Sequence, residues 1–418
     1  MSIVFFEDTS WKNFVPLSYT RSLFDLKIGS LTTFEHFNNK YKSSKFLTRQ
    51  YLEKVTKERH PDNIVNKLEY NGDDIFINSL FIPLKSFFKK WSMKKKFLIS
   101  FGDKILMGRI DKSDFEYLYE SVVHDKKINS NRISTEMTDI NDLDECGALY
   151  SWPWDFIFHI KQILTSQLRL KNKVPNGIKV IGNNPVYVDK TSIIGEGTIL
   201  DASDGGIYIG PQSTIYQSSI NGPVHVGEYS QVKPYSIVSN SYIGNNCRIA
   251  GEIDSSIILD YTNKSHLGYL GHCYVGEWVN IGANTVTSDL KMTYGTISMK
   301  VGNEKKDTKI IKLGSFFGDM SKTSIGTNIY CGMRIGVSSH IYGNIFNDVP
   351  SYVIYGKGIG SENAEMNISS SIEFQKRMMS RRNVNMSLEY ETMMRRLFEI
   401  TSSERKKYDV RSKRFTIR

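Results

Sequence analysis

Residues 263–291 carry side chains whose types suit acid–base chemistry on a charged substrate. His266 is the candidate general base, because a free imidazole has a pKa of about 6.5 and is mostly neutral at physiological pH. Lys264 precedes it by two residues and offers a fixed positive charge of the kind that binds phosphate. Each residue also has an ordinary interpretation, since surface histidines and solvated lysines are common. The elements that position these residues are therefore the next question.

A repeat covers the region that contains these residues. An Ile, Leu or Val followed by Gly occurs 13 times between residues 178 and 356, and once in residues 1–177. Aliphatic side chains recur there at intervals of six, as at Ile237, Ile243 and Ile249. This period is the signature of a parallel β-helix, in which each short strand directs one aliphatic side chain into the coil. A β-sandwich with glycine-rich turns, the alternative, predicts no such period.

Other segments depart from the repeat. Residues 292–314 interrupt it with charges and are expected to leave the β-helix as a hairpin. Residues 1–175 alternate short apolar runs with helical stretches, which is an α/β pattern. An amphipathic helix is expected at 151–170, and two short helices, broken near 383–385, at 371–400. We therefore expect three parts: an α/β domain (1–175), a β-helix (176–358) and a basic helical extension (359–418).

The composition limits the class of protein. The chain has 418 residues, four cysteines in no CxxC pair and a formal net charge of +10, much of it near the C-terminus. Such cysteines argue against a disulfide framework or a structural zinc site and favour a cytoplasmic location. No apolar run approaches the roughly 20 residues that span a bilayer, and the N-terminus lacks a secretory pattern. No nucleic-acid motif accompanies the basic tail, so a nucleic-acid partner is not expected.

Zinc bound between subunits, as in γ-type carbonic anhydrases, is an alternative use of the histidines. The candidates are His225, His266 and His272. Zinc needs ligands that converge at about 2.0–2.1 Å from one point. His266 and His272 are six residues apart, instead of the offset of five that this class uses, so the spacing argues against a zinc site.

Two segments carry a resemblance to a known family. Residues 263–291 (NKSHLGYLGHCYVGEWVNIGANTVTSDLK) resemble the acetyltransferase half of the bifunctional GlmU enzymes, with their His-Leu-x-Tyr-Leu-Gly and Val-Asn-Ile-Gly-Ala patterns. Residues 13–32 are similar to the opening of a GlmU-related subfamily of sugar nucleotidyltransferases. The resemblance is close over 190–345 and loose over 40–150. It implies a nucleotidyltransferase-like α/β domain, a left-handed parallel β-helix and a homotrimer of packed prisms.

The resemblance also implies an activity for the β-helix. It is the transfer of an acetyl or other acyl group from acetyl-CoA to an amino-sugar 1-phosphate, with His266 as the catalytic base. The expected ligand-binding residues are Lys233, Lys264, Tyr269 and Asn280 for the sugar phosphate, and Ala283 and Lys322 for acetyl-CoA. Two positions depart from the family: Asp254 aligns with a phosphate-binding lysine, and Asp319 aligns around the position of a serine that lies near the acyl donor in the family. Acyl transfer remains the expected class, and the sugar and acyl group stay open.

For the N-terminal domain, the resemblance implies nucleotidyl transfer from a nucleoside triphosphate to a sugar 1-phosphate, with Mg²⁺. Arg21 is the candidate phosphate contact. The first strand, however, runs into FFEDTSWKNFVP, which has no glycine to form a phosphate cradle. A domain with a degenerate site is therefore an alternative, and the chain as a whole could be an assembly or regulatory subunit.

The metal ligands of that domain are not assigned. Asn78 lies where the family's metal-binding aspartate is expected, and an amide is a poorer Mg²⁺ ligand than a carboxylate. Asp73, Asp74 and Asp103 are candidates to compensate.

Overall fold

The computed structural model describes residues 2–38, 44–302, 304–408, 410–412 and 415. The chain forms two compact units. The first comprises residues 1–14, 20–153 and 388–393, and the second comprises residues 15–19, 154–387 and 394–418. The second unit thus includes residues 154–175, expected with the first domain, and most of the C-terminal extension, expected as a domain of its own. Within the described residues, no helix has the length and apolarity needed to cross a membrane.

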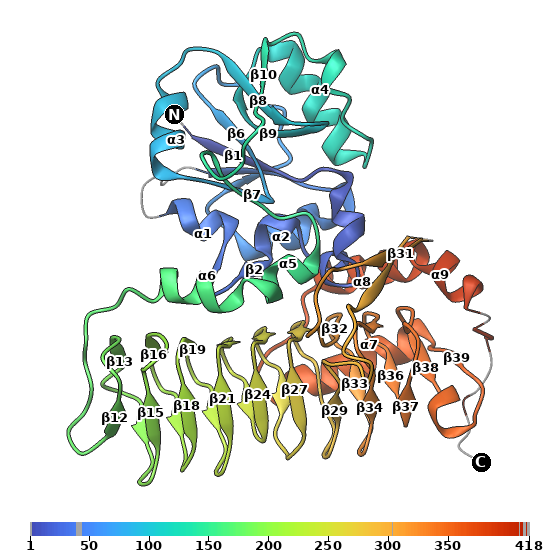
Figure 1. Ribbon diagram of the computed structural model, residues 1–418. Helices are drawn as coiled ribbons and strands as arrows, with labels where there is room; N and C mark the ends of the chain where they lie inside the picture. Colours follow the sequence, from blue (N-terminus) through green and yellow to red (C-terminus); the bar gives the residue numbers. More distant parts are fainter. Residues whose placement is uncertain (1, 39–43, 303, 409, 413–414, 416–418) are drawn as a thin grey trace. The chain divides into compact units, whose positions relative to one another are not determined.

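The first unit contains a mostly parallel sheet of seven strands (Figure 1). Their order is β10 (Met137–Asp139), β8 (Phe97–Phe101), β9 (Lys104–Arg109), β6 (Ile75–Asn78), β1 (Ile3–Phe6), β4 (Ser44–Leu47) and β5 (Ile64–Val65). The central strand β1 is parallel to β4 and β6, and only β9 is antiparallel to its neighbours. Successive residues of β1 enter two different apolar cores, so both faces of the sheet are buried, as the α/β pattern predicts.

Short elements complete this unit and connect it to the next. The helices are α1 (Thr33–Asn38), α2 (Glu53–Arg59), α3 (Lys85–Ser92) and α4 (Lys112–Val123), with 3-10 helices η1 (Thr9–Phe14), η3 (Leu23–Asp25), η4 (Gln50–Leu52) and η5 (Ser130–Arg132). The 3-10 helix η2 (Leu17–Tyr19) belongs to the second unit. Two small antiparallel pairs are β2 (Lys27–Ile28) with β3 (Leu31–Thr32), and β7 (Phe81–Pro83) with β11 (Gly147–Leu149). The helix expected at 151–170 is present as α5 (Pro153–Phe158) and α6 (Ile160–Gln167).

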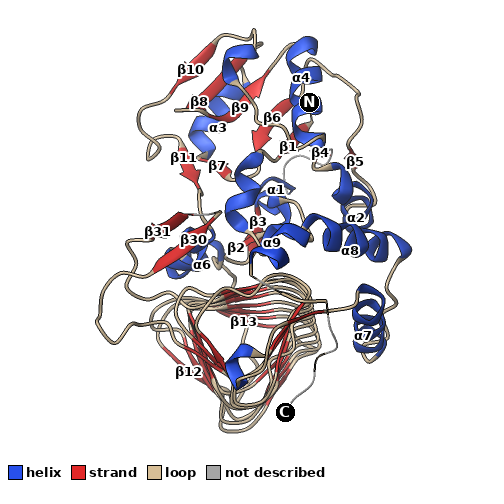
Figure 2. Cartoon of the chain, turned by 90° about the vertical axis from the view of Figure 1, so that its right-hand side faces the viewer, coloured by secondary structure: helices blue, strands red, loops and turns tan. Residues whose placement is uncertain are grey.

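The second unit is a three-sided prism of parallel strands, as the six-residue period predicts (Figure 2). The first face holds β12 (Lys179–Ile181), β15 (Ile199–Asp201), β18 (Ser219–Asn221), β21 (Ile237–Ser239), β24 (Glu252–Asp254), β27 (Tyr269–Gly271), β29 (Val286–Thr287), β34 (Asn328–Ile329) and β37 (Asn344–Ile345). The second holds β13 (Val186–Val188), β16 (Ile207–Ile209), β19 (Val224–Val226), β22 (Tyr242–Ile243), β25 (Ile257–Ile258), β28 (Tyr274–Val275), β32 (Phe316–Phe317) and β35 (Arg334–Ile335). The third holds β14 (Ile193–Ile194), β17 (Thr214–Ile215), β20 (Gln231–Val232), β23 (Arg248–Ile249), β26 (Asn263–Lys264), β33 (Lys322–Thr323), β36 (His340–Ile341), β38 (Val353–Tyr355) and the antiparallel β39 (Ala364–Glu365).

The prism winds in a left-handed sense. Figure 2 looks along its axis from the C-terminal end, and the chain approaches the reader as it passes from the face of β12 to the face of β13 in a clockwise direction. A coil that turns clockwise while it advances toward the viewer is left-handed. The handedness implied by the resemblance is therefore confirmed.

One aliphatic side chain from most of the strands fills the interior. On the third face, Ile215, Val232 and Ile249 are register partners in successive coils and are fully buried. The charged segment 292–314 leaves the prism as expected and forms the hairpin of β30 (Ser298–Val301) and β31 (Glu304–Asp307). It interrupts no interior row, because β28 pairs directly with β32 across the excursion.

The C-terminal extension forms η6 (Lys357–Ile359), α7 (Ile368–Ser380), α8 (Leu388–Ile400) and α9 (Ser402–Lys407), so the expected break near 383–385 is confirmed. Helix α7 is fastened to the prism by buried polar contacts. The Ser338 hydroxyl lies 2.7 Å from that of Ser371, and the Gln375 amide donates to Ser338. Arg405 of α9 is also buried and donates to Glu365 at 2.6 Å.

Candidate functional site

Three of the expected site residues lie along one edge of the prism, where the chain turns from the third face into the first. We call this edge the His266 corner (residues 195–198, 216–218, 233–236, 250–251, 265–268, 282–285, 324–327 and 342–343). It carries Lys233, His266 and Ala283. Neighbouring coils are about 4.8 Å apart, so His266 and Ala283 are one coil apart and Lys233 lies two coils from His266. The corner thus brings the expected base, a cation and the expected acyl-donor position into one row.

His266 is exposed, and its imidazole makes no hydrogen bond or ion pair with the described residues. The backbone that carries it is fixed. The Leu267 carbonyl accepts a 3.0 Å hydrogen bond from Asn284 N in the next coil. Gly268 has φ +133°, and a Cβ there would lie 2.2 Å from the Thr285 carbonyl oxygen, so only glycine fits. A rigid corner therefore presents the imidazole to solvent.

Lys264 does not lie at the rim. It is the register partner of Ile249, so it takes an interior position of the third face, and its side chain is 1% exposed. Its ammonium donates to the carbonyls of Ala250 and His266, each at 2.9 Å. Burial lowers its pKa to about 8. The expectation that Lys264 contacts substrate phosphate is thereby corrected, since its ammonium supports the corner from inside.

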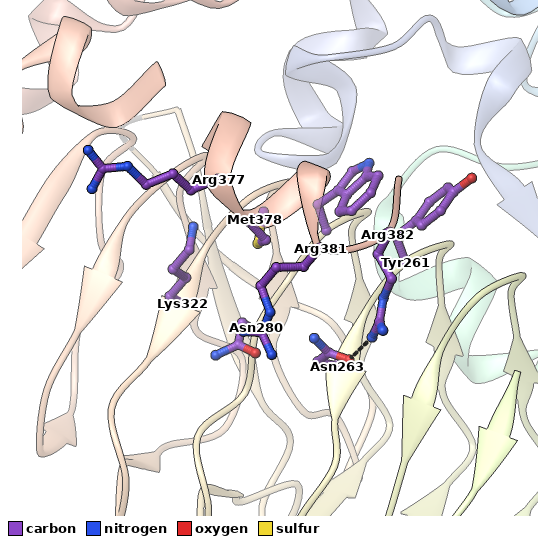
Figure 3. A pocket seen from close by; sticks show the side chains of 9 residues that line it. Tyr261, Asn263, Asn280, Lys322, Arg377, Met378, Arg381 and Arg382 are labelled. Carbon is purple, nitrogen blue, oxygen red and sulfur yellow. Dashed lines mark hydrogen bonds between the residues drawn. The ribbon is translucent and has the colours of Figure 1, made fainter. Parts of the chain in front are cut away.

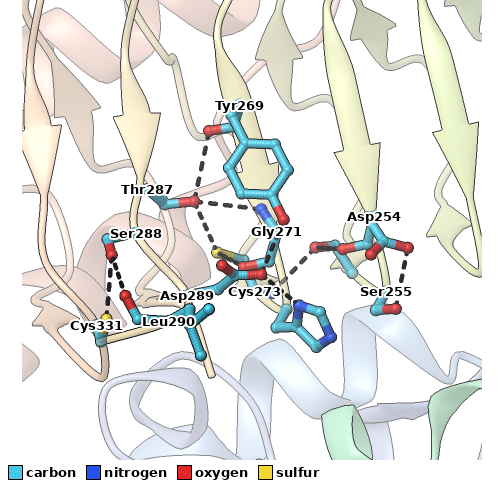
Figure 4. Close-up of polar contacts among 12 residues, drawn as sticks. Asp254, Ser255, Tyr269, Gly271, Cys273, Thr287, Ser288, Asp289, Leu290 and Cys331 are labelled. Carbon is cyan, nitrogen blue, oxygen red and sulfur yellow. Dashed lines mark hydrogen bonds and ion pairs between the residues drawn. The ribbon is translucent and has the colours of Figure 1, made fainter. Parts of the chain in front are cut away.

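Tyr269 begins β27 on the first face and takes part in a polar cluster that the sequence analysis did not single out (Figure 4). Its hydroxyl donates to Asp289 Oδ2 at 2.8 Å, and His272 Nδ1 lies 2.7 Å from the same oxygen. Burial and the hydrogen bond to Asp289 raise the pKa of Tyr269. Burial alone would raise the pKa of Asp289, but the hydrogen bonds from His272 and Tyr269 hold it below its usual value.

Asn280 and Lys322 meet on the third face (Figure 3). Asn280 pairs in parallel register with Asn263 of β26 on one side and with Lys322 of β33 on the other. All three residues line a cavity of about 270 Å³. The other lining residues are Tyr261, Trp278, Arg377, Met378, Arg381 and Arg382. Burial lowers the pKa of Lys322 to about 8, and its ammonium donates to the Met320 carbonyl at 3.0 Å. The sequence analysis did not predict these three arginines as site residues, although it noted the excess of basic residues near the C-terminus that includes them.

A single chain does not assemble every expected residue. Tyr269 lies on the first face, while Asn280 and Lys322 lie on the third, and His266 lies at the corner between them. The two departures from the family have structural roles. Asp254 accepts from Asn240 Nδ2 at 3.2 Å, and the buried Asp319 accepts from the Glu277 backbone N–H at 2.8 Å.

The histidines of the zinc alternative lie apart. His225 is on the second face, stacked 4.6 Å from the ring of Tyr208 and 5.0 Å from that of Tyr242. His266 is at its corner, and His272 is bound to Asp289 at the edge between the first and second faces. Across the described residues, no three His, Cys, Asp or Glu side chains are grouped to hold a metal ion.

In the first unit, a buried ion pair lies at the carboxyl end of β1, where a phosphate cradle would be expected. Arg49 Nε donates to Glu7 Oε1 at 2.9 Å, with both side chains at most 3% exposed. The Arg49 guanidinium also stacks 4.1 Å from the Trp11 ring and donates to the Arg21 carbonyl at 3.1 Å. Arg21 is itself only 3% exposed. The expected phosphate contact, Arg21, is therefore buried. The neighbouring cation, Arg49, is already paired with Glu7.

The expected metal ligands are not brought together either. Asn78 is buried at the end of β6, and its amide donates to Asp8 Oδ2 at 3.0 Å. Asp73 and Asp74 precede β6 and so lie at the opposite edge of the sheet, where Asp74 pairs with Lys45 at 2.7 Å. Of the three aspartates, Asp103, in the turn between β8 and β9, lies at the same edge of the sheet as Asn78. These donors do not fit the Mg²⁺ site that the resemblance implies.

The chain is similar in sequence to known proteins. Residues 3–173 match the sequence model of the sugar nucleotidyl transferase family. The GlmU protein of Methanococcus vannielii is 25% identical over 72% of this chain and 68% of its own length. The chain is thus similar to GlmU proteins over most of its length. A GlmU protein of Methanocaldococcus jannaschii is 30% identical over 26% of each chain. A bifunctional sugar-1-phosphate nucleotidylyltransferase/acetyltransferase of Sulfurisphaera tokodaii is 28% identical over 46% of this chain and 43% of that protein. The matched region thus spans about a quarter to two thirds of these relatives.

The interior position of Lys264 predicts a dependence of stability on pH. The pKa of the ammonium is about 8 in the folded protein and 10.5 for a solvated lysine, so between these pH values the unfolded chain binds more protons. The free energy of unfolding of the wild type, relative to Lys264→Met, should therefore rise between pH 8 and 10.5, by up to about 3 kcal/mol. Urea unfolding of both proteins across this range measures the difference, and a difference independent of pH would contradict the burial argument.

Proposed function

We propose that the β-helix transfers an acetyl or related acyl group from acetyl-CoA to an amino-sugar 1-phosphate, as one step of sugar-nucleotide synthesis. The observation that carries this proposal is the exposed imidazole of His266 on a rigid corner, one coil from Ala283. The names of the relatives, which include a nucleotidylyltransferase/acetyltransferase, support it.

In this reaction His266 removes a proton from the attacking amine as the nitrogen bonds to the thioester carbonyl carbon. The carbon–sulfur bond then breaks, and the proton held by the imidazole passes to the departing thiolate. Exposure leaves the imidazole accessible to the attacking amine. Lys233, half-buried against the ring of Tyr216, supplies a cation on the same corner for the substrate phosphate.

We further propose that the protein acts as a homotrimer. Four large apolar side chains are exposed along the His266 corner: Tyr216 (39%), Tyr235 (81%), Leu267 (63%) and Ile325 (77%). A row of such residues on one edge is typical of a subunit interface. A neighbouring prism on this edge would also supply a second copy of the first or third face, and with it the Tyr269 or Asn280 that one chain keeps apart.

The N-terminal unit has two candidate functions. The family match supports nucleotidyl transfer to a sugar 1-phosphate. The Glu7–Arg49 pair and the neutral Asn78 favour the second candidate, a domain of the same fold with a degenerate site that serves assembly or regulation.

Replacement of the base should affect turnover and leave donor binding unchanged. We expect His266→Ala to lower kcat for acetyl transfer by about 10²–10⁴-fold, the range for a lost general base. Affinity for acetyl-CoA should stay within about twofold, because the expected acyl-donor residues are others. His124→Ala, just after α4 in the first unit, is the control. Initial rates with glucosamine 1-phosphate as acceptor measure this, and undiminished turnover in His266→Ala would reject the mechanism.

Disruption of the corner should dissociate the oligomer. Tyr235 is 81% exposed in the isolated chain, so Tyr235→Glu should not unfold the prism but should place a charge in the proposed interface. We expect a trimer for the wild type by light scattering at micromolar concentration, and monomers with reduced acetyl transfer for the variant. A wild-type monomer, or a Tyr235→Glu trimer, would contradict the proposed assembly.

The two candidates for the N-terminal unit differ in a direct assay. Pyrophosphate release is measured with the four common nucleoside triphosphates, sugar 1-phosphates and Mg²⁺. The buried pair predicts no release above background, and a metal-dependent release would establish nucleotidyl transfer. Asn78→Asp, which restores the carboxylate, tests whether the amide limits the reaction.

A further inference from the structure

The cavity on the third face is lined by cations that come from two distant parts of the sequence. Lys322 rises from β33, and Arg377, Arg381 and Arg382 come from the end of α7 and the residues that follow it. Figure 3 shows Arg381 and Arg382 reaching from the helix toward the strands, with Lys322 pointing up toward the helix and Arg377 at the side. Four cations therefore surround a space of about 270 Å³.

This positive charge is not neutralised by the cavity wall. None of the nine lining residues carries a carboxylate. Arg382 Nη2 donates at 2.7 Å to Asn263 Oδ1, an oxygen of a neutral amide, and the Lys322 ammonium donates at 3.0 Å to the Met320 carbonyl. Burial and the charge of Arg382 lower the pKa of the adjacent Arg248. Gathering like charges in a partly enclosed space costs free energy unless an anion joins them.

The wall also offers geometry suited to a phosphate. Guanidinium groups bind phosphate oxygens through paired N–H donors, and the Asn280 amide lies on the floor of the same cavity. The cavity volume of about 270 Å³ is enough to hold one phosphate or pyrophosphate group.

We infer that helix α7 completes an anion site on the third face, formed by Lys322, Arg381 and Arg382, that binds the phosphate group of a phosphorylated ligand. This assigns a role to the basic C-terminal extension. The helix is held in place by the contacts of Ser371 and Gln375 with Ser338, so the arginines are positioned before the ligand arrives. The identity of the ligand rests on the proposed acyl transfer, whereas the anion site itself does not.

Isothermal titration with inorganic pyrophosphate at low salt tests the site without any catalytic assay. The full-length wild type should bind, and the double variant Arg381→Gln/Arg382→Gln should bind at least about tenfold more weakly, the loss expected for one charge-assisted hydrogen bond. Lys376→Gln is the matched control, because Lys376 lies on the same helix, pairs with Glu373 at 4.0 Å and does not line the cavity. Lys322→Gln, which leaves the helix untouched, should weaken binding as well.

Three further probes identify which phosphate is bound. Coenzyme A, dephospho-coenzyme A and glucosamine 1-phosphate are titrated into the wild type and the double variant. A preference for coenzyme A over dephospho-coenzyme A that disappears in the variant assigns the site to the donor, and loss of glucosamine 1-phosphate binding assigns it to the acceptor. Failure of the wild type to bind pyrophosphate, or equal loss in Lys376→Gln, would overturn the inference. Pyrophosphate binding together with undiminished turnover in His266→Ala would instead reject the proposed function and leave the anion site standing.

Discussion

The narrow interior of the prism is the constraint on which the second unit depends. Each coil has room for about one inward side chain per strand, and those of the third face, Ile215, Val232 and Ile249, stack in one fully buried row. Because side chains alternate along a strand, the residue before each of these must point outward. The same packing that stabilises the prism therefore decides which residues are available for binding.

This constraint explains why the chemistry is concentrated at one corner and one face. Strands of two or three residues offer few outward positions, so exposed functional groups lie either in the corners, as His266 does, or in outward rows such as Asn263, Asn280 and Lys322. Lys264 occupies an inward position and satisfies its ammonium with two corner carbonyls. A buried cation of this kind is tolerated only because the hydrogen bonds replace part of its hydration.

The sequence predicted the features that repeat or are local. The six-residue period identified the β-helix, and the charged excursion and the break in the C-terminal helices were confirmed as a hairpin and as α7 and α8. Features that depend on long-range packing were not predictable. The inward position of Lys264 breaks the aliphatic pattern, and the burial of Arg21 depends on the pair between Glu7 and Arg49. The site residues themselves remain predictions, apart from the correction at Lys264.

The contact between Arg382 and Asn263 joins residues that are 119 positions apart, and α7 follows the last coil of the prism. During synthesis on the ribosome, the coils emerge first and can stack in order as each one leaves the exit tunnel. The cavity on the third face, in contrast, closes only when α7 and the arginines that follow it have emerged. A nascent chain would thus first carry a stacked prism with an open third face, and it could hold an anion there only after α7 had docked.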